Sequence, residues 1–151
     1  MNTSELKVRL MDDLWQNKNI VSLIDADDVL YPDELVYTHI YPYLKIDSGI
    51  QQEVKTYIGI KIDYPSIPQK DIYAAFQLTV AVFCHQSKMK TKLGGTRADL
   101  IADAIIDMWN GDTSGEFRFD LISNKEDVLD HNYYYRKLVF KSMTIQRSAC
   151  Q

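Results

Sequence analysis

The chain has 151 residues, of which 46% are hydrophobic and 25% charged, and its formal net charge is −4. This size and composition are typical of one globular unit with a substantial core, so we expect residues 1–151 to form a single domain. The negative balance argues against a protein whose main task is to grip a nucleic-acid backbone, and no apolar run approaches the roughly 20 residues of a membrane helix.

The first predicted element is an amphipathic helix over residues 4–17. Asn2 and Glu5 have the spacing of a capping box, which is typical of a helix start. Because this stretch is polar on one side and has no continuous apolar segment, we predict no signal peptide. The apolar residues that recur at helical spacing are Leu6, Leu10, Met11, Leu14 and Trp15.

Residues 19–54 are expected to form an extended loop or arm. The part from 19 to 36 is rich in aspartate and turn-forming residues, which predicts a loop with a short helix at 32–35. The segment 38–46 is aromatic and prone to β structure, but Pro42 interrupts it. Proline cannot donate to a strand ladder, so this segment is predicted to be an edge strand or an arm.

Residues 55–146 are expected to form the core sheet and its covering helix. A helix is predicted over 97–110, because apolar residues form a wide stripe and Gly111 suits the left-handed position after its end. The later strands carry apolar or aromatic residues on both faces, so one face is expected to pack on helices and the other on a partner or a lumen. The predicted strands span 38–46, 55–63, 72–85, 117–121 and 133–145.

Together these elements predict an α+β fold. We expect a mostly antiparallel sheet of about four to five strands, packed by two helices, in the order α-β-β-β-α-β-β.

No arrangement of residues indicates catalysis, so we expect no enzyme activity, no cofactor and no metal site. Cys84 and His85 are adjacent in a predicted strand and would point to opposite faces, which excludes them as a nucleophile and its base. Asp99, Asp103 and Asp107 line one face of the predicted helix 97–110. This stripe is typical of the solvated side of an amphipathic helix, although three carboxylates can also bind a divalent cation.

The predicted loop between the strand 72–85 and the helix 97–110 is basic and ends in glycine. Its positive residues are Lys88, Lys90, Lys92 and Arg97. Three interpretations stay open: a solvated turn, an electrostatic contact strip toward a neighbouring subunit or a DNA passage, and a small-anion site at Gly94-Gly95. The glycine pair lacks the spacing of a P-loop or of a dinucleotide-binding motif.

Four segments of the chain resemble small neck proteins of tailed phages of Gram-positive hosts, and the resemblance as a whole extends from about residue 5 to 146. The order of the predicted elements is also similar to the tail-terminator fold of long-tailed phages. The segments are His39-Ile40-Tyr41-Pro42-Tyr43, the strand from Thr79 to Gln86, Lys92-Leu93-Gly94-Gly95-Thr96-Arg97-Ala98-Asp99, and Tyr135-Arg136-Lys137-Leu138-Val139-Phe140.

This resemblance implies a ring in the neck of the virion, usually a hexamer, assembled in the host cytoplasm. Such a ring caps the tail tube, ends its polymerisation and joins the tail to the head connector. The implied partners are other copies of the chain, the tail tube protein, a head-side neck protein, a sheath or collar protein if the tail contracts, and DNA that passes without sequence-specific binding. No membrane is implied.

Two alternatives remain beside the tail terminator. One is a head-completion or adaptor protein below the portal, and the other is an anion- or nucleotide-binding regulatory domain that uses the Gly94-Gly95 turn. For a ring subunit, the residues expected to contact a partner are Tyr41, Tyr43, Lys88, Lys90, Lys92 and Arg97.

Overall fold

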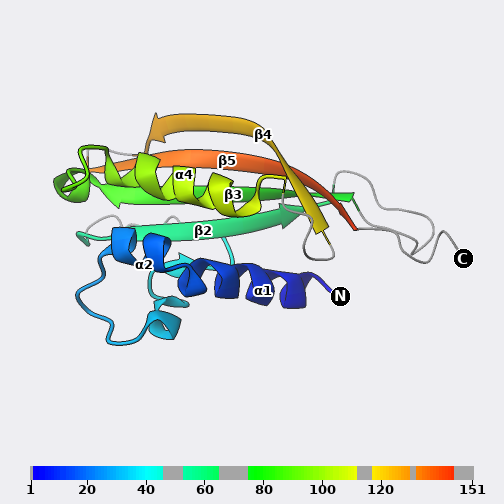
Figure 1. The fold of residues 1–151 in the computed structure, drawn as a ribbon, viewed down its shortest axis with the longest axis horizontal. Helices are drawn as coiled ribbons and strands as arrows, with labels where there is room; N and C mark the ends of the chain where they lie inside the picture. Colours follow the sequence, from blue (N-terminus) through cyan, green and yellow to red (C-terminus); the bar gives the residue numbers. More distant parts are fainter. Residues whose placement is uncertain (1, 46–52, 65–74, 112–116, 130–131, 145–151) are drawn as a thin grey trace, which may run out of the picture.

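The computed structural model describes residues 2–45, 53–64, 75–111, 117–129 and 132–144. Within them, helices cover one face of a five-stranded sheet whose strands lie in the order β1-β2-β3-β5-β4 (Figure 1). β1 pairs in parallel with β2, and every other neighbouring pair is antiparallel. The predicted α+β class with a mostly antiparallel sheet is therefore confirmed. The strands are β1 (Ile40–Tyr41), β2 (Thr56–Asp63), β3 (Ala75–His85), β4 (Phe117–Val128) and β5 (Tyr133–Thr144).

Helix α1 (Thr3–Gln16) begins at the predicted capping box. The side chain of Asn2 accepts from the amide of Glu5, and the Glu5 carboxylate accepts from the Asn2 amide. The buried residues of α1 are Leu6, Leu10, Met11 and Leu14, which confirms the amphipathic pattern.

A third helix, α2 (Lys18–Ile24), occupies part of the segment that the sequence predicts as a loop. Asn17 ends α1 and also caps α2, because its side chain accepts from the amide of Ile20 at 3.1 Å. Three residues of α2 then enter the core at helical spacing: Ile20, Leu23 and Ile24. The prediction of a loop over 19–36 is thus wrong for its first part, whereas the short helix η1 (Pro32–Leu35) lies where it was predicted.

Helix α4 (Arg97–Trp109) packs on β3, β4 and β5, while α1 packs on β1 and β2. The indole Nε1 of Trp109 donates to Asp13 Oδ2 at 3.2 Å, which ties the C-terminal end of α4 to α1. Gly111 has φ +76°, as predicted for the position after this helix, and its amide donates to the Phe119 carbonyl on the outer edge of β4. The helix end therefore covers part of an otherwise open strand edge. None of the helices in the described segments is long and apolar enough to cross a membrane.

The helix-free face of the sheet carries a second, smaller core at one end. Tyr57 stacks on Phe83 with ring centroids 4.6 Å apart and planes 12° apart, and it meets Tyr133 edge-on at 5.9 Å. The backbone that follows β1 crosses over β2 here, so a Cβ at Gly59 would lie only 2.7 Å from the Tyr43 carbonyl oxygen. The aromatic residues at this end are thus buried within the subunit, where the sequence predicted a face available to a partner.

Two strands differ from their predicted lengths. β1 has only two residues, because Pro42 ends the ladder. β4 continues to Val128, well beyond the predicted end at Leu121, through a register shift between Leu121 and Ser123. The polar second half of β4 has no alternating apolar pattern, so only its pairing with β5 defines it as a strand.

Candidate functional site

The loop between β3 and α4, residues 86–96, is a braced protrusion that we call the basic loop. It begins with a short helix, η2 (Gln86–Lys88). Its two sides are joined by a backbone bridge between Lys90 and Thr96, and the Thr91 hydroxyl donates to the Gly95 carbonyl at 2.7 Å. Leu93 stands at the tip and is 73% exposed. The loop thus presents an apolar tip on a fixed base.

The three lysines of the basic loop have different surroundings. Lys88 Nζ donates to the backbone carbonyl of Asp25 at 2.9 Å, so this side chain helps to anchor the loop to the end of α2. Lys90 and Lys92 are exposed, and neither forms an ion pair with any residue that the structure describes. The prediction that Lys90 and Lys92 contact a partner stays a prediction, and their position is compatible with it.

Arg97 is a structural residue, contrary to its predicted place in the contact strip. Its side chain is only 12% exposed. Its Nε donates to the Lys88 carbonyl at 2.7 Å, and an Nη donates to the Leu23 carbonyl at 2.5 Å. The Leu23 carbonyl belongs to the last turn of α2, where a positive charge is favourable. The guanidinium therefore joins the basic loop to α2 inside the subunit.

The geometry does not favour an anion site at the Gly94-Gly95 turn. The backbone amide of Arg97 is taken by the Met89 carbonyl at 2.8 Å, and Asp99 places a carboxylate in the first turn of α4. Partial burial raises the pKa of Asp99, but hydrogen bonds from Thr96 and Arg136 outweigh that effect and lower it. An ionised carboxylate in the first turn of this helix disfavours a second negative charge at the helix start.

A cavity of about 380 Å³ lies beside this helix start, between α4 and the strands β4 and β5. Arg136 is one of its lining residues and has three polar partners. They are Asp99 at 2.7 Å, Asn124 at 2.7 Å and Glu126 at 3.2 Å. The guanidinium is therefore neutralised within the subunit, so the cavity offers no positive group to an anionic ligand. Asp103 and Asp107 are exposed on the same helix, as predicted for its solvated side.

The two tyrosines predicted as contacts lie in different surroundings. Tyr41 is 3% exposed and packs in the second core, and its hydroxyl donates to the Thr38 carbonyl at 2.8 Å. The Lys55 ammonium donates to the same hydroxyl at 3.0 Å. Tyr41 is thus fully engaged within the subunit, which removes it from the candidate surface. Tyr43, at 43% exposed, keeps a ring face that a partner can reach.

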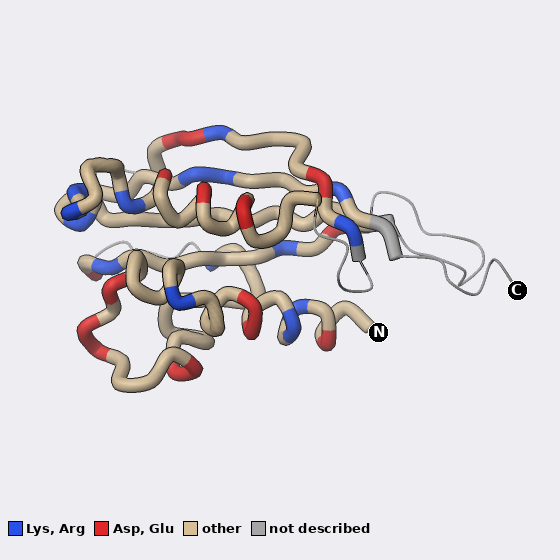
Figure 2. Tube along the Cα trace, in the orientation of Figure 1, with Lys and Arg blue, Asp and Glu red and all other residues tan. Residues whose placement is uncertain are grey.

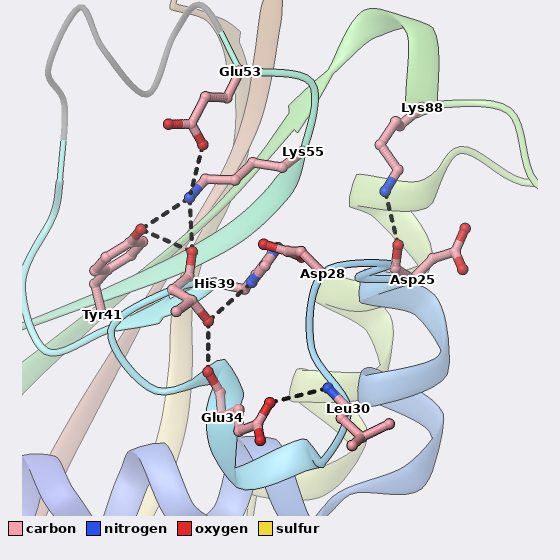
Figure 3. A network of polar contacts seen from close by, with 10 residues as sticks. Asp25, Asp28, Leu30, Glu34, His39, Tyr41, Glu53, Lys55 and Lys88 are labelled. Carbon is pink, nitrogen blue, oxygen red and sulfur yellow. Dashed lines mark hydrogen bonds and ion pairs between the residues drawn. The ribbon is translucent and has the colours of Figure 1, made fainter.

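His39 connects this edge to Asp28, in the segment that follows α2 (Figure 3). Its Nε2 lies 3.3 Å from Asp28 Oδ1, and its Nδ1 lies 3.1 Å from the Thr38 hydroxyl. Burial lowers the pKa of His39 below its ordinary value, with the nearby Lys55 acting in the same direction and Asp28 partly opposing them. The imidazole therefore favours its neutral form, and it is a structural joint in this network.

The described residues show no arrangement that indicates catalysis. No three histidine, cysteine, aspartate or glutamate side chains among them lie close enough to hold a metal ion. Burial raises the pKa of the Cys84 thiol, which is fully enclosed in the main core, so it is a poor nucleophile.

Sequence reasoning missed one surface: the segment that runs from the end of α2 into η1, which we call the acidic loop (residues 25–34). Figure 2 shows that its acidic residues lie at the same end of the molecule as the basic loop. Leu30 in this loop is 79% exposed, although it is a large aliphatic residue. In the sequence, this segment has several acidic residues around an apolar pair. That pattern is equally typical of an ordinary polar turn. The acids are Asp25, Asp27, Asp28, Asp33 and Glu34.

Comparison with known proteins gives one family. No curated protein matches the chain. The model of the YomW family matches residues 17–142, which include α2, the whole described sheet except the end of β5, and both charged loops. The match covers well over half of the chain, and the chain therefore belongs to the YomW family.

Proposed function

We propose that the chain is a structural subunit of a phage virion, a tail terminator whose copies form a ring on the tail tube. The name of the YomW family suggests a phage-derived Bacillus protein, which supports a phage-associated role. The resemblance of the sequence to neck proteins of tailed phages supports the more specific assignment. The proposal includes no catalytic step and no cofactor.

The observation that best supports a ring is the presence of two oppositely charged loops at one end of the subunit. A ring needs two different surfaces on each copy, one that meets the other on the next copy. The basic loop and the acidic loop are such a pair, since both project at one end and carry opposite charges (Figure 2). In this ring, Tyr43 and the exposed lysines Lys90 and Lys92 are available to neighbours or to the tail tube.

The test is deletion of the gene from the phage or prophage that encodes the chain, followed by electron microscopy of the lysate. We expect tails of irregular, excessive length and heads without joined tails, and complementation by the intact gene restores uniform particles. An epitope-tagged copy that restores infectivity should label the neck. Uniform tails of normal length that remain detached from heads would instead favour the head-completion alternative.

A second measurement separates assembly from ligand binding. Native mass spectrometry and thermal melting of the purified protein are carried out with and without inorganic phosphate or a nucleoside triphosphate. A ligand that binds only the folded state raises the melting temperature. We expect no such rise, whereas a monomer stabilised by either anion would support a regulatory binding domain and contradict the proposal.

A further inference from the structure

A groove runs along the outer side of α2, and it is mainly apolar beside Trp15 and more polar beside the acidic loop. It consists of two adjoining cavities of about 290 and 420 Å³, which share Val21, Ser22 and Pro32. The first also reaches Asp25 and the exposed Leu30. The residues that give the groove its apolar lining are Trp15, Val21, Ala26, Val29, Pro32 and Leu35.

Acidic residues lie beside the part of the groove that the acidic loop forms, whereas Lys18 lines the part beside Trp15. Asp27 and Asp33 are exposed on the loop and helix that border it, and neither forms an ion pair with a residue that the structure describes. Asp28 and Asp25 lie 3.3 and 4.0 Å from His39 and Arg97, but both carboxylates stay largely exposed, so they add to the negative charge of Asp27 and Asp33. An apolar groove with an acidic rim fits an aliphatic side chain that is flanked by positive charges.

The basic loop of the same chain has these properties. Leu93 at its tip is 73% exposed, so it does not occupy the groove of its own subunit. Lys92 precedes it directly, Lys90 lies two residues further back, and both are exposed. Gly94 has φ +88°, and a Cβ added there would meet no atom within 4 Å, so the tip makes a tight turn in open space. Since the loop is braced at its base, little ordering is required on binding.

We propose that the Lys90–Gly94 tip of one copy docks into the α2 groove of a second copy. Leu93 enters the groove between Val21 and Pro32, and the two lysines face the acidic rim. This contact rests on the proposed function, for which it supplies the surface between neighbouring subunits. The two charge patterns are complementary and belong to one chain, so a second copy is the occupant that the observations favour.

The experiment uses two charge-reversed variants of the full chain. One carries Lys90→Glu with Lys92→Glu, and the other carries Asp27→Lys with Asp33→Lys. In each variant both surfaces have the same sign, so we expect self-association to weaken by at least about tenfold. In an equimolar mixture every reversed tip can meet a groove of opposite sign, and association should return. Sedimentation velocity and native mass spectrometry measure the assembly of each sample.

Two further variants complete the design. One is a control for the reversed tip: Lys125→Glu with Lys137→Glu changes the net charge as Lys90→Glu with Lys92→Glu does. These two lysines are exposed on the helix-free face of the sheet, so this variant should assemble as the wild-type protein does. Leu93→Ser removes the apolar tip alone and should weaken association without changing the net charge. Circular dichroism and melting temperature establish that each variant is folded before its assembly is compared.

The outcomes are distinct. Restoration in the mixture, with neither variant assembling alone, supports the contact. Unchanged assembly of both reversed variants, failure of the mixture, or a wild-type protein that stays monomeric at every concentration overturns it. Each variant is also introduced into the phage: normal tail lengths with a failed mixing test reject this contact and leave the tail-terminator proposal standing. Normal tails after deletion of the whole gene reject the proposal itself.

Discussion

Replacing Arg97 with methionine should destabilise the subunit far more than a surface substitution does. Methionine keeps much of the apolar stem but removes the two hydrogen bonds to the carbonyls of Leu23 and Lys88. Those carbonyls lie at the end of α2 and at the base of the basic loop. Without the guanidinium, α2 and the loop lose their direct connection through this side chain, and a poorly hydrated helix end is left without a donor.

The expected loss in the free energy of unfolding is about 3 kcal/mol. A hydrogen bond that involves a charged group contributes roughly 1.5–3 kcal/mol, and two are removed from a side chain that is mostly buried. We take the lower end for each, because water can partly replace the donor. The contact with Asp25 is long, at 4.0 Å, and that carboxylate is well exposed, so it adds less than about 1 kcal/mol.

Urea denaturation followed by tryptophan fluorescence measures this loss. With a slope of about 2 kcal/mol/M, the midpoint should fall by roughly 1.5 M. Lys92→Met is the matched control, since it removes an exposed positive charge from the same loop and should change stability by less than about 0.5 kcal/mol. If both variants lose equally little free energy of unfolding, the structural role of Arg97 is refuted, and its predicted role as a partner contact is favoured instead.

Three other substitutions, with Gly94→Ala as a control for one of them, test the second core and the contacts of His39 by the same denaturation assay. Gly59→Ala forces a Cβ to within 2.7 Å of the Tyr43 carbonyl oxygen, so the backbone must shift, and it should cost about 2–3 kcal/mol. Gly94→Ala has φ +88° but open space and should cost only about 1 kcal/mol. Equal costs would contradict the close approach. Tyr57→Ala empties a fully buried aromatic site and should cost about 3–5 kcal/mol, and a loss below 1 would contradict its packing. For His39, burial lowers the folded-state pKa below 6.5, so the unfolded chain binds more protons in acid. Stability should therefore be full above pH 6.5 and fall as the pH drops toward the folded-state pKa. His39→Asn should lose that part of the dependence, and parallel curves for the two proteins would refute it.

The main helices and strands could be predicted from the sequence because their signals are local. The apolar residues of α1 and α4 recur at helical spacing, and β2, β3 and β5 are rich in β-branched and aromatic residues. The capping box at Asn2 and the left-handed Gly111 depend only on residues nearby in the chain. Such features need no knowledge of what packs against them.

The weaker elements could not be read in this way. α2 is only seven residues long and starts from a cap, Asn17, that also ends α1. The second half of β4 is polar and becomes a strand through its pairing with β5. In both cases tertiary contacts select a structure that local preference leaves undecided.

The candidate surface shows the same division. The sequence alone determined that residues 86–97 are basic and that residues 38–46 are aromatic. Only the tertiary structure decided which of their side chains are available: Lys90, Lys92 and Tyr43 lie outside, whereas Arg97 and Tyr41 are enclosed. The physical reason is sequence distance. Arg97 finds its carbonyl partner 74 residues away in α2, and no periodicity or charge pattern encodes a hydrogen bond across that separation.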